Sequence, residues 1–182
     1  MLDEVYKAYK NNPPHLFRPN SKYIVTGSTY LKRRHLIDQD SKEQLLLTIL
    51  KGCQKYGWKL EDWVVLDNHY HLILESPENA DSLPGLINSI HRFSSIWIRE
   101  NKAINLPEKI FHNYWDSCIT YEGSYFARLN YVYFNPVRHG YVSHPRDYRF
   151  GSYFYRYRRS PEELEVLQCK YPFDGINVRD DF

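Results

Sequence analysis

Residues 64–77 read VVLDNHYHLILESP, and this stretch decides the expected fold because it has the pattern of a β-hairpin. Two strand-like runs, 58–67 and 69–76, meet at the turn-forming pair Asp67-Asn68. Successive side chains of a strand point to opposite faces, so His69 and His71 share one face of the sheet. Two imidazoles about 7 Å apart along a strand can bind one metal ion. An isolated pair of this kind is more often two half-exposed histidines near a turn. Other residues must therefore show whether His69 and His71 form a metal site.

The segments around this hairpin complete a β-α-β-β-α-β order followed by a third helix. The expected strands are 21–30, 58–67, 69–76 and 109–121, and the expected helices are 41–57, 81–102 and 123–135. The first helix has a capping-box pattern at Ser41 and Gln44 and ends at Gly57. The third is expected to end at Asn135-Pro136, because the residue before a proline avoids the α region. This order predicts an α+β, ferredoxin-like split βαβ fold, with an antiparallel sheet of about four strands and helices packed on it.

Length and composition predict one domain in a reducing compartment. The 182 residues are 42% hydrophobic and 25% charged, as is typical of a soluble globular chain. The sequence contains no run of about 18 apolar residues, so no membrane span is expected. The first 17 residues contain no apolar stretch, so no secretory signal is expected either. Three widely spaced cysteines suit the cytoplasm and form no zinc motif.

The charge is unevenly distributed along the chain. The net charge is +2, but the first 159 residues carry +6 and residues 160–182 carry −4. Basic clusters at 31–35 (LKRRH) and 155–159 (YRYRR), together with 17 tyrosines, fit a nucleic-acid-binding protein, although ordinary surface charge explains them almost as well. We therefore expect a basic main domain at 1–159, to which the resemblance described below assigns catalysis, and an acidic tail at 160–182. The tail is either a solubilising end or a cover for the basic face.

The third helix carries a second set of polar residues. Arg128, Tyr131 and Asn135 follow an i, i+3, i+7 spacing and share one helical face. A different face, which can contact the sheet, carries Phe126, Leu129 and Tyr133. Tyr131 is therefore expected to point away from the core, with Asn135 offering an amide oxygen suited to Mg²⁺ or Mn²⁺. Taken singly, Tyr131 could be a semi-buried aromatic residue and Asn135 a helix cap.

Three motifs in this order resemble a known family. DNHYHLIL (67–74), YVYFNPVRHGYV (131–142) and PRDYRFGSY (145–153) resemble the single-tyrosine HUH transposases, and above all the REP-associated tyrosine transposase subgroup. The resemblance covers roughly residues 22–155. Tyr70 stands where the family usually has an aliphatic residue, Asp67 where proline is common, and Gly151 where the subgroup has a serine.

The resemblance implies a metal-dependent single-stranded DNA transesterase that nicks and rejoins hairpin-containing DNA. His69, His71 and Asn135 would bind Mg²⁺ or Mn²⁺, and Tyr131 would be the nucleophile that forms a 5′-phosphotyrosine. Deprotonation of Tyr131 would be helped by the metal or by Arg128. The expected DNA contacts are Arg33, Arg34, Arg128, Arg138, Arg156, Arg158 and Arg159. A monomer is favoured over a homodimer that exchanges the tyrosine helix.

Two other functions remain open from the sequence. One is a non-catalytic nucleic-acid-binding protein on the same fold. The other is a metal-dependent hydrolase that uses His69, His71 and a further histidine, either His91 or His112, with water as the nucleophile and no covalent adduct.

Overall fold

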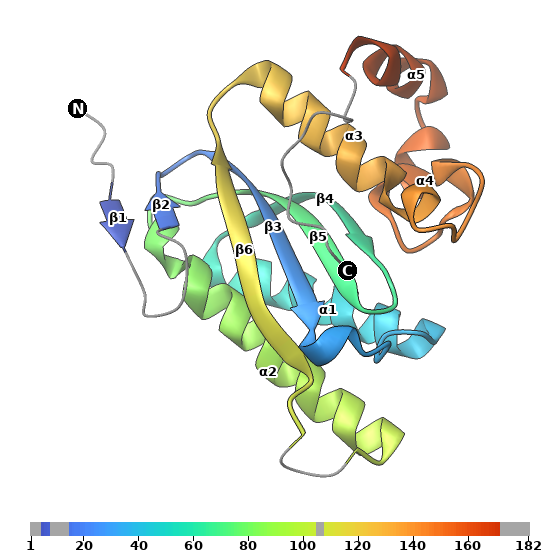
Figure 1. Cartoon of the computed structure of the whole chain (residues 1–182). Coiled ribbons are helices and arrows are strands. Elements are labelled where there is room, and N and C mark those ends of the chain that lie inside the picture. Colours follow the sequence, from blue (N-terminus) through green and yellow to red (C-terminus); the bar gives the residue numbers. More distant parts are fainter. Residues whose placement is uncertain (1–4, 8–14, 105–107, 172–182) are drawn as a thin grey trace.

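A four-stranded antiparallel sheet forms the centre of the protein (Figure 1). The computed structural model describes residues 5–7, 15–104 and 108–171. The strands are β3 (Lys22–Thr29), β4 (Lys59–Val65), β5 (His69–Glu75) and β6 (Phe111–Ile119), in the spatial order β4-β5-β3-β6. This is the order of a split βαβ unit, so the predicted fold is confirmed. The hairpin β4-β5 and the strand β3 beside it place residues 69–71 in the interior of the sheet.

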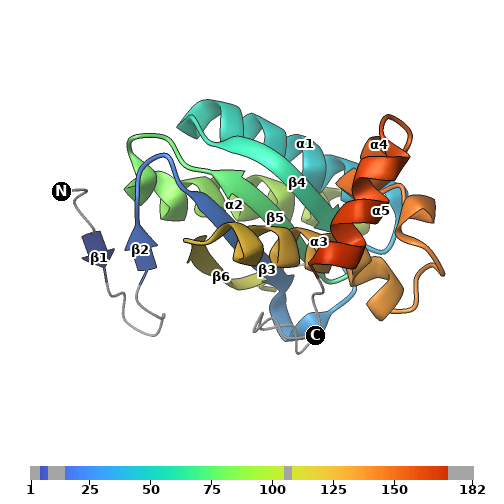
Figure 2. The ribbon, with the colours of Figure 1, turned by 90° about the horizontal axis from the view of Figure 1, so that it is seen from above.

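Two helices cover one face of the sheet (Figures 1 and 2), namely α1 (Gln39–Tyr56) and α2 (Leu83–Lys102). Their apolar residues pack with Tyr70, Leu72 and Leu74, which are the alternate side chains of β5. The predicted cap at Ser41 is wrong: α1 begins earlier, because the carboxylate of Asp38 caps it by accepting a hydrogen bond from the Ser41 amide at 2.9 Å.

Tyr70, the departure from the family pattern, is accommodated on this face. The ring is fully buried, and its hydroxyl lies 2.9 Å from Nε2 of His91. The residue opposite it on β3 is Gly27, where a side-chain Cβ would clash with the ring. A glycine on the neighbouring strand thus provides the space that the larger side chain needs.

The opposite face of the sheet is covered by α3 (Glu122–Arg138), with α4 (Ser152–Tyr157) and α5 (Pro161–Lys170) beside it (Figures 1 and 2). The helix α3 does not end at Asn135-Pro136 as predicted. It continues to Arg138, with Pro136 in its last turn. The carbonyl of Asn135 accepts from the His139 amide at 3.1 Å, and that of Pro136 accepts from the Tyr141 amide at 2.9 Å. Pro136 lacks a backbone N–H, so α3 loses only one hydrogen-bond donor, and the packing of the helix on the sheet compensates for this loss.

The segment after residue 160 is partly helical. Leu164 is buried in the hydrophobic cluster that also contains residues of α3. The side-chain amide of Asn130, on α3, donates to the carbonyls of Leu167 (3.1 Å) and Tyr171 (2.6 Å). The helix α5 is therefore attached to α3. The boundary at residue 160 stays a prediction, and the acidic residues beyond 171 lie outside the described residues.

Smaller elements complete the fold. The strands β1 (Val5–Lys7) and β2 (His15–Phe17) form a two-stranded sheet that was not predicted from the sequence. The short 3₁₀ turns are η1 (Tyr30–Lys32), η2 (Ala80–Ser82) and η3 (Pro145–Asp147). No helix in the described part of the chain has both the length and the apolarity needed to cross a bilayer.

Candidate metal and nucleophile site

The histidines of β5 point to the face that α3 covers. His69 lies opposite Ser28 of β3, and His71 lies opposite Thr26. Both histidines are buried, and their ring centroids are 5.2 Å apart. The alternation of side chains predicted for residues 69–76 therefore places both imidazoles on one face of the sheet, which α3 covers.

Each imidazole is oriented through its Nδ1 atom. Nδ1–H of His69 donates to Oδ1 of Asn68 at 2.7 Å, and Nδ1 of His71 lies 2.8 Å from the hydroxyl of Thr26. The amide of Asn68 is itself fixed, since its Nδ2 donates to the carbonyl of Lys32 at 3.3 Å. Such partners orient metal-binding histidines in proteins. A cation would therefore be bound through Nε2 of each ring.

Asn135 meets His69 across the interface between α3 and the sheet. Its Oδ1 atom lies 3.2 Å from Nε2 of His69, and both side chains are buried. With the proton of His69 on Nδ1, Nε2 and the amide oxygen are two acceptors that face one another. Two ligand atoms bound to one cation at about 2.1 Å and at right angles lie roughly 3 Å apart. The donor set therefore fits a shared divalent cation.

Tyr131 lies one helical turn before Asn135. Its ring is 5.2 Å from the ring of His71, nearly perpendicular to it, and the guanidinium of Arg138 lies 5.0 Å from the ring centroid. The prediction that Tyr131 points away from the core is wrong, because it is only 1% exposed. The face of α3 that carries the polar residues also packs on the sheet.

Arg128 lies half-buried on α3 and contacts its own helix. Its guanidinium donates to the hydroxyl of Ser124, one turn earlier on α3, and burial lowers its pKa. Arg138 is instead the cation that lies over the ring of Tyr131.

His139 adds a residue that the sequence reasoning missed. Its ring centroid is 4.9 Å from that of His69. The signal was available, because His139 follows Asn135 by four residues and so lies on the same side of the helix.

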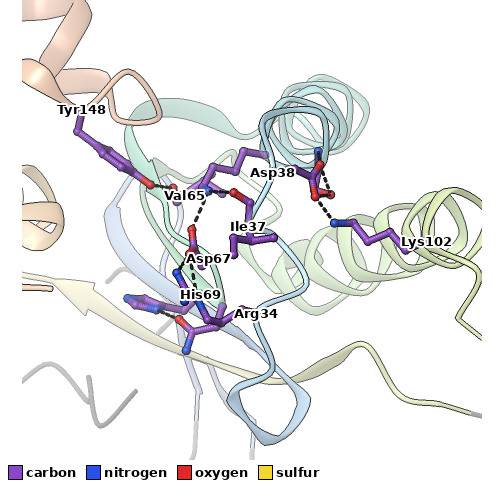
Figure 3. A network of polar contacts seen from close by, with 11 residues as sticks. Arg34, Ile37, Asp38, Val65, Asp67, His69, Lys102 and Tyr148 are labelled. Atoms are coloured by element: carbon purple, nitrogen blue, oxygen red, sulfur yellow. Dashed lines mark hydrogen bonds and ion pairs between the residues drawn. The ribbon is translucent and has the colours of Figure 1, made fainter. Parts of the chain in front are cut away.

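A carboxylate braces the turn that precedes the histidines (Figure 3). Asp67 is buried and accepts from Nζ of Lys42 at 2.7 Å and from Nε of Arg34 at 3.0 Å. The ion pair raises the pKa of the Arg34 guanidinium. Tyr148 adds a hydrogen bond from its hydroxyl to the carbonyl of Val65 at 2.8 Å. These contacts stabilise the backbone of the turn that precedes His69.

Three of the other predicted DNA-binding arginines contact side chains of the protein itself. Arg33 pairs with Glu108 near the site. Arg156 pairs with Asp62, a carboxyl with no exposed surface whose pKa is raised by burial. Arg158 lies 3.6 Å from the ring centroid of Phe154, and Arg159 lines a surface cavity between β4 and α5. The last three belong to the region of α4, whereas Arg34 pairs with Asp67 in the turn before His69 and Arg138 lies over the ring of Tyr131.

The structure does not support a site made of three histidines. His91 lies on the opposite face of the sheet, stacked on Phe111 at 4.5 Å, and burial lowers its pKa to about 3. His112 stacks on Tyr30 at 6.2 Å. Among the residues described, no three His, Cys, Asp or Glu side chains are placed to hold a metal. A third ligand to a metal at His69 and His71 would therefore be an amide oxygen such as that of Asn135.

Comparison with known proteins identifies the family of the chain. The family described as "Transposase IS200 like" matches residues 23–129, and the chain belongs to this family. The REP-associated tyrosine transposase of Escherichia coli (strain K12) is 28% identical over an alignment of 173 positions, and the match covers 88% of this chain and 92% of that protein. The putative REP-associated tyrosine transposase of Haemophilus influenzae is 26% identical over 109 residues, covering 56% and 62% of the two chains.

A solved structure has the same fold. It is that of a REP-associated tyrosine transposase bound to a REP hairpin, with a TM-score of 0.64 and 21% identity, and the match covers 97% of this chain and 94% of the other. The resemblance drawn from the three motifs is thereby confirmed.

Proposed function

We propose that this transposase cleaves and rejoins single-stranded DNA next to a hairpin, through a covalent bond between Tyr131 and a 5′-phosphate. The observation that carries the proposal is the 3.2 Å approach of His69 Nε2 and Asn135 Oδ1, with the Tyr131 ring beside His71. The hairpin part rests on the similar transposase solved with a REP hairpin.

The proposed metal ligands are Nε2 of His69, Nε2 of His71 and Oδ1 of Asn135. Two nitrogens and one hard oxygen leave coordination positions open, and Mg²⁺ or Mn²⁺ suits such a mixed set. When bound, a divalent cation supplies polarisation of the phosphate and offsets negative charge in the transition state.

The protein residues carry out the exchange of bonds. Oη of Tyr131 attacks the phosphorus, the bond from phosphorus to the 3′-oxygen breaks, and that oxygen leaves with a proton as a 3′-hydroxyl. The product is a 5′-phosphotyrosine, and attack by a 3′-hydroxyl reverses the step without consuming a nucleotide cofactor. The guanidinium of Arg138, 5.0 Å from the ring, stabilises negative charge on the phenol oxygen and on the phosphate.

All four proposed site residues come from one chain. The strand β5 supplies the histidines, and α3 supplies Tyr131 and Asn135 after a short connection from β6. Exchange of the tyrosine helix with a second subunit is therefore unnecessary, which favours a functional monomer.

The test is a covalent capture experiment with a hairpin oligonucleotide that carries a single-stranded flank. In the presence of Mg²⁺ or Mn²⁺, a 3′ label should remain on the denatured protein and a 5′ label should not. Trypsin releases residues 129–138, which contain both Tyr131 and Tyr133, so fragmentation of this peptide must place the nucleotide on Tyr131.

Other outcomes would overturn the proposal in different ways. Cleavage without a label on the protein would indicate a hydrolase. Tight binding without cleavage would indicate a non-catalytic DNA-binding protein. Cleavage at the wild-type rate by His71→Ala would exclude the proposed metal site.

A further inference from the structure

A cavity of about 400 Å³ opens beside the site and is lined by Arg34, Asn68, His139, Gly140 and Tyr141. Its volume is within the roughly 300–1,000 Å³ range of small-molecule sites. The walls come from three places in the sequence: the loop before α1, the turn between β4 and β5, and the segment that follows α3. None of these five residues is a proposed metal ligand or the nucleophile.

The cavity shares a wall with the metal site. Asn68 accepts the Nδ1–H hydrogen bond of His69, and the ring of His139 lies 4.9 Å from the ring of His69. A group that enters the cavity therefore lies next to any phosphate held at His69. On a DNA strand, the group nearest to that phosphate is the base or sugar of an adjoining nucleotide.

The lining has the chemistry of a base-binding pocket rather than of a bare phosphate site. Arg34 uses Nε and one terminal nitrogen on Asp67, which orients the guanidinium, and its side chain remains 61% exposed. A guanidinium has five N–H donors, so further donors can serve the acceptor edge of a base. Tyr141 is half-buried, and its ring packs at 5.8 Å against that of Tyr148, which restricts its orientation. An aromatic face and a fixed donor are the two elements that hold an unpaired base.

From this placement we infer that the cavity binds the base of one nucleotide that adjoins the scissile phosphate. The inference rests on the function proposed above and adds a position at which the enzyme contacts the unpaired strand. Arg34 then contacts the edge of the base, and Tyr141 contacts its face. The base would align the phosphodiester bond with Tyr131 by filling a pocket whose wall includes Asn68, the hydrogen-bond partner of His69.

Equilibrium binding tests the pocket without requiring catalysis. The protein is Tyr131→Phe, and the probes are hairpin oligonucleotides in which one base of the single-stranded flank at a time is replaced by an abasic site. Removal of the base that fills the pocket should weaken binding about tenfold, as expected for the loss of one stacked base. In Tyr131→Phe/Tyr141→Leu and in Tyr131→Phe/Arg34→Gln, the same abasic site should cause little further loss.

A matched control is Tyr121→Ala in the same background. Tyr121 is 76% exposed at the opposite end of α3, so this variant should keep the full abasic sensitivity. Thermal unfolding of each variant confirms that it is folded, and Arg34→Gln leaves Asp67 its partner Lys42.

The inference is overturned if no single abasic position matters, or if the abasic loss stays about tenfold in both pocket variants. These outcomes differ from a failure of the proposed function, which would appear as the absence of a Tyr131 adduct in the wild-type protein.

Discussion

Two tyrosines on one helix, Tyr131 and Tyr133, should respond in opposite ways to the loss of a single oxygen atom. Both are buried, at 1% and 3% exposure. Tyr131 contacts His71 and Arg138, whereas the hydroxyl of Tyr133 donates to Oδ1 of Asp62 at 3.0 Å. Tyr131→Phe should therefore abolish cleavage with little loss of stability, and Tyr133→Phe should keep cleavage with a measurable loss of stability.

The size of the stability loss follows from the surroundings of Asp62. This carboxyl is fully buried and also accepts from Ser152 (2.8 Å) and from Nε of Arg156 (2.7 Å). A hydrogen bond to a charged group contributes about 1.5–3 kcal/mol. Because other donors continue to serve Asp62, we expect the lower value, about 1.5 kcal/mol, for Tyr133→Phe. In a domain of this size that corresponds to a fall in Tm of about 3–6 °C.

The expected difference in cleavage between the two variants follows from the protonation of Tyr133 and the position of Tyr131. Burial, followed by the Asp62 carboxylate, raises the pKa of Tyr133, so its hydroxyl stays protonated and is a poor nucleophile. Tyr131→Phe keeps the ring contacts with His71 and Arg138, and its stability should stay within about 1 kcal/mol of wild type.

The assay combines thermal unfolding with capture of a 3′-labelled hairpin oligonucleotide on denatured protein. An adduct that forms on Tyr131→Phe would refute the assignment of the nucleophile. A Tyr133→Phe protein with an unchanged Tm would show that the hydrogen bond from Tyr133 to Asp62 does not stabilise the fold. If the same protein also failed to cleave DNA, Tyr133 rather than Tyr131 would carry the reactive oxygen.

Three further predictions concern the metal, the core and the cation. His71→Ala should abolish cleavage in Mg²⁺ or Mn²⁺, and Asn135→Ala should reduce it less, as measured by strand cleavage over a titration of the metal; equal rates for His71→Ala and wild type would contradict this. Arg156→Ala should lower the free energy of unfolding by about 1.5–3 kcal/mol, because Asp62 is fully buried but Arg156 is half-exposed and two other donors remain; chemical denaturation measures this, and a loss below about 0.5 kcal/mol would argue against the pairing. Arg138→Gln should slow adduct formation by about 10²-fold or more at saturating DNA, as measured by single-turnover kinetics, and an unchanged rate would remove this arginine from the mechanism.

The fold was predictable because its strands and helices have clear periodicity. The alternation in 69–76 and the helical spacing of Leu45, Ile49 and Cys53 describe the same core that the structure shows. The ends of the helices were less predictable, because they depend on individual contacts. The carboxylate of Asp38 competes successfully with Ser41 for the start of α1.

The candidate site was predictable as a set of residues and less so as a set of contacts. His69 and His71 follow from the two-residue period of a strand, and Asn135 follows from the spacing along α3. Thr26 could not be foreseen as the partner of His71, because that pairing depends on the register between β3 and β5, strands that are 45 residues apart at this point.

The error about Tyr131 has a specific physical origin. Helical periodicity assigns one buried and one exposed face, but α3 is covered by the sheet on one side and by α5 on another, through the hydrogen bonds from Asn130 to Leu167 and Tyr171. In such a helix burial does not separate a core tyrosine from a reactive one. The neighbours of the two residues differ instead: the hydroxyl of Tyr133 donates to the carboxylate of Asp62, which opposes a phenolate there, whereas Tyr131 contacts the imidazole of His71 and the guanidinium of Arg138. In the mechanism proposed above, that guanidinium would stabilise negative charge at Tyr131.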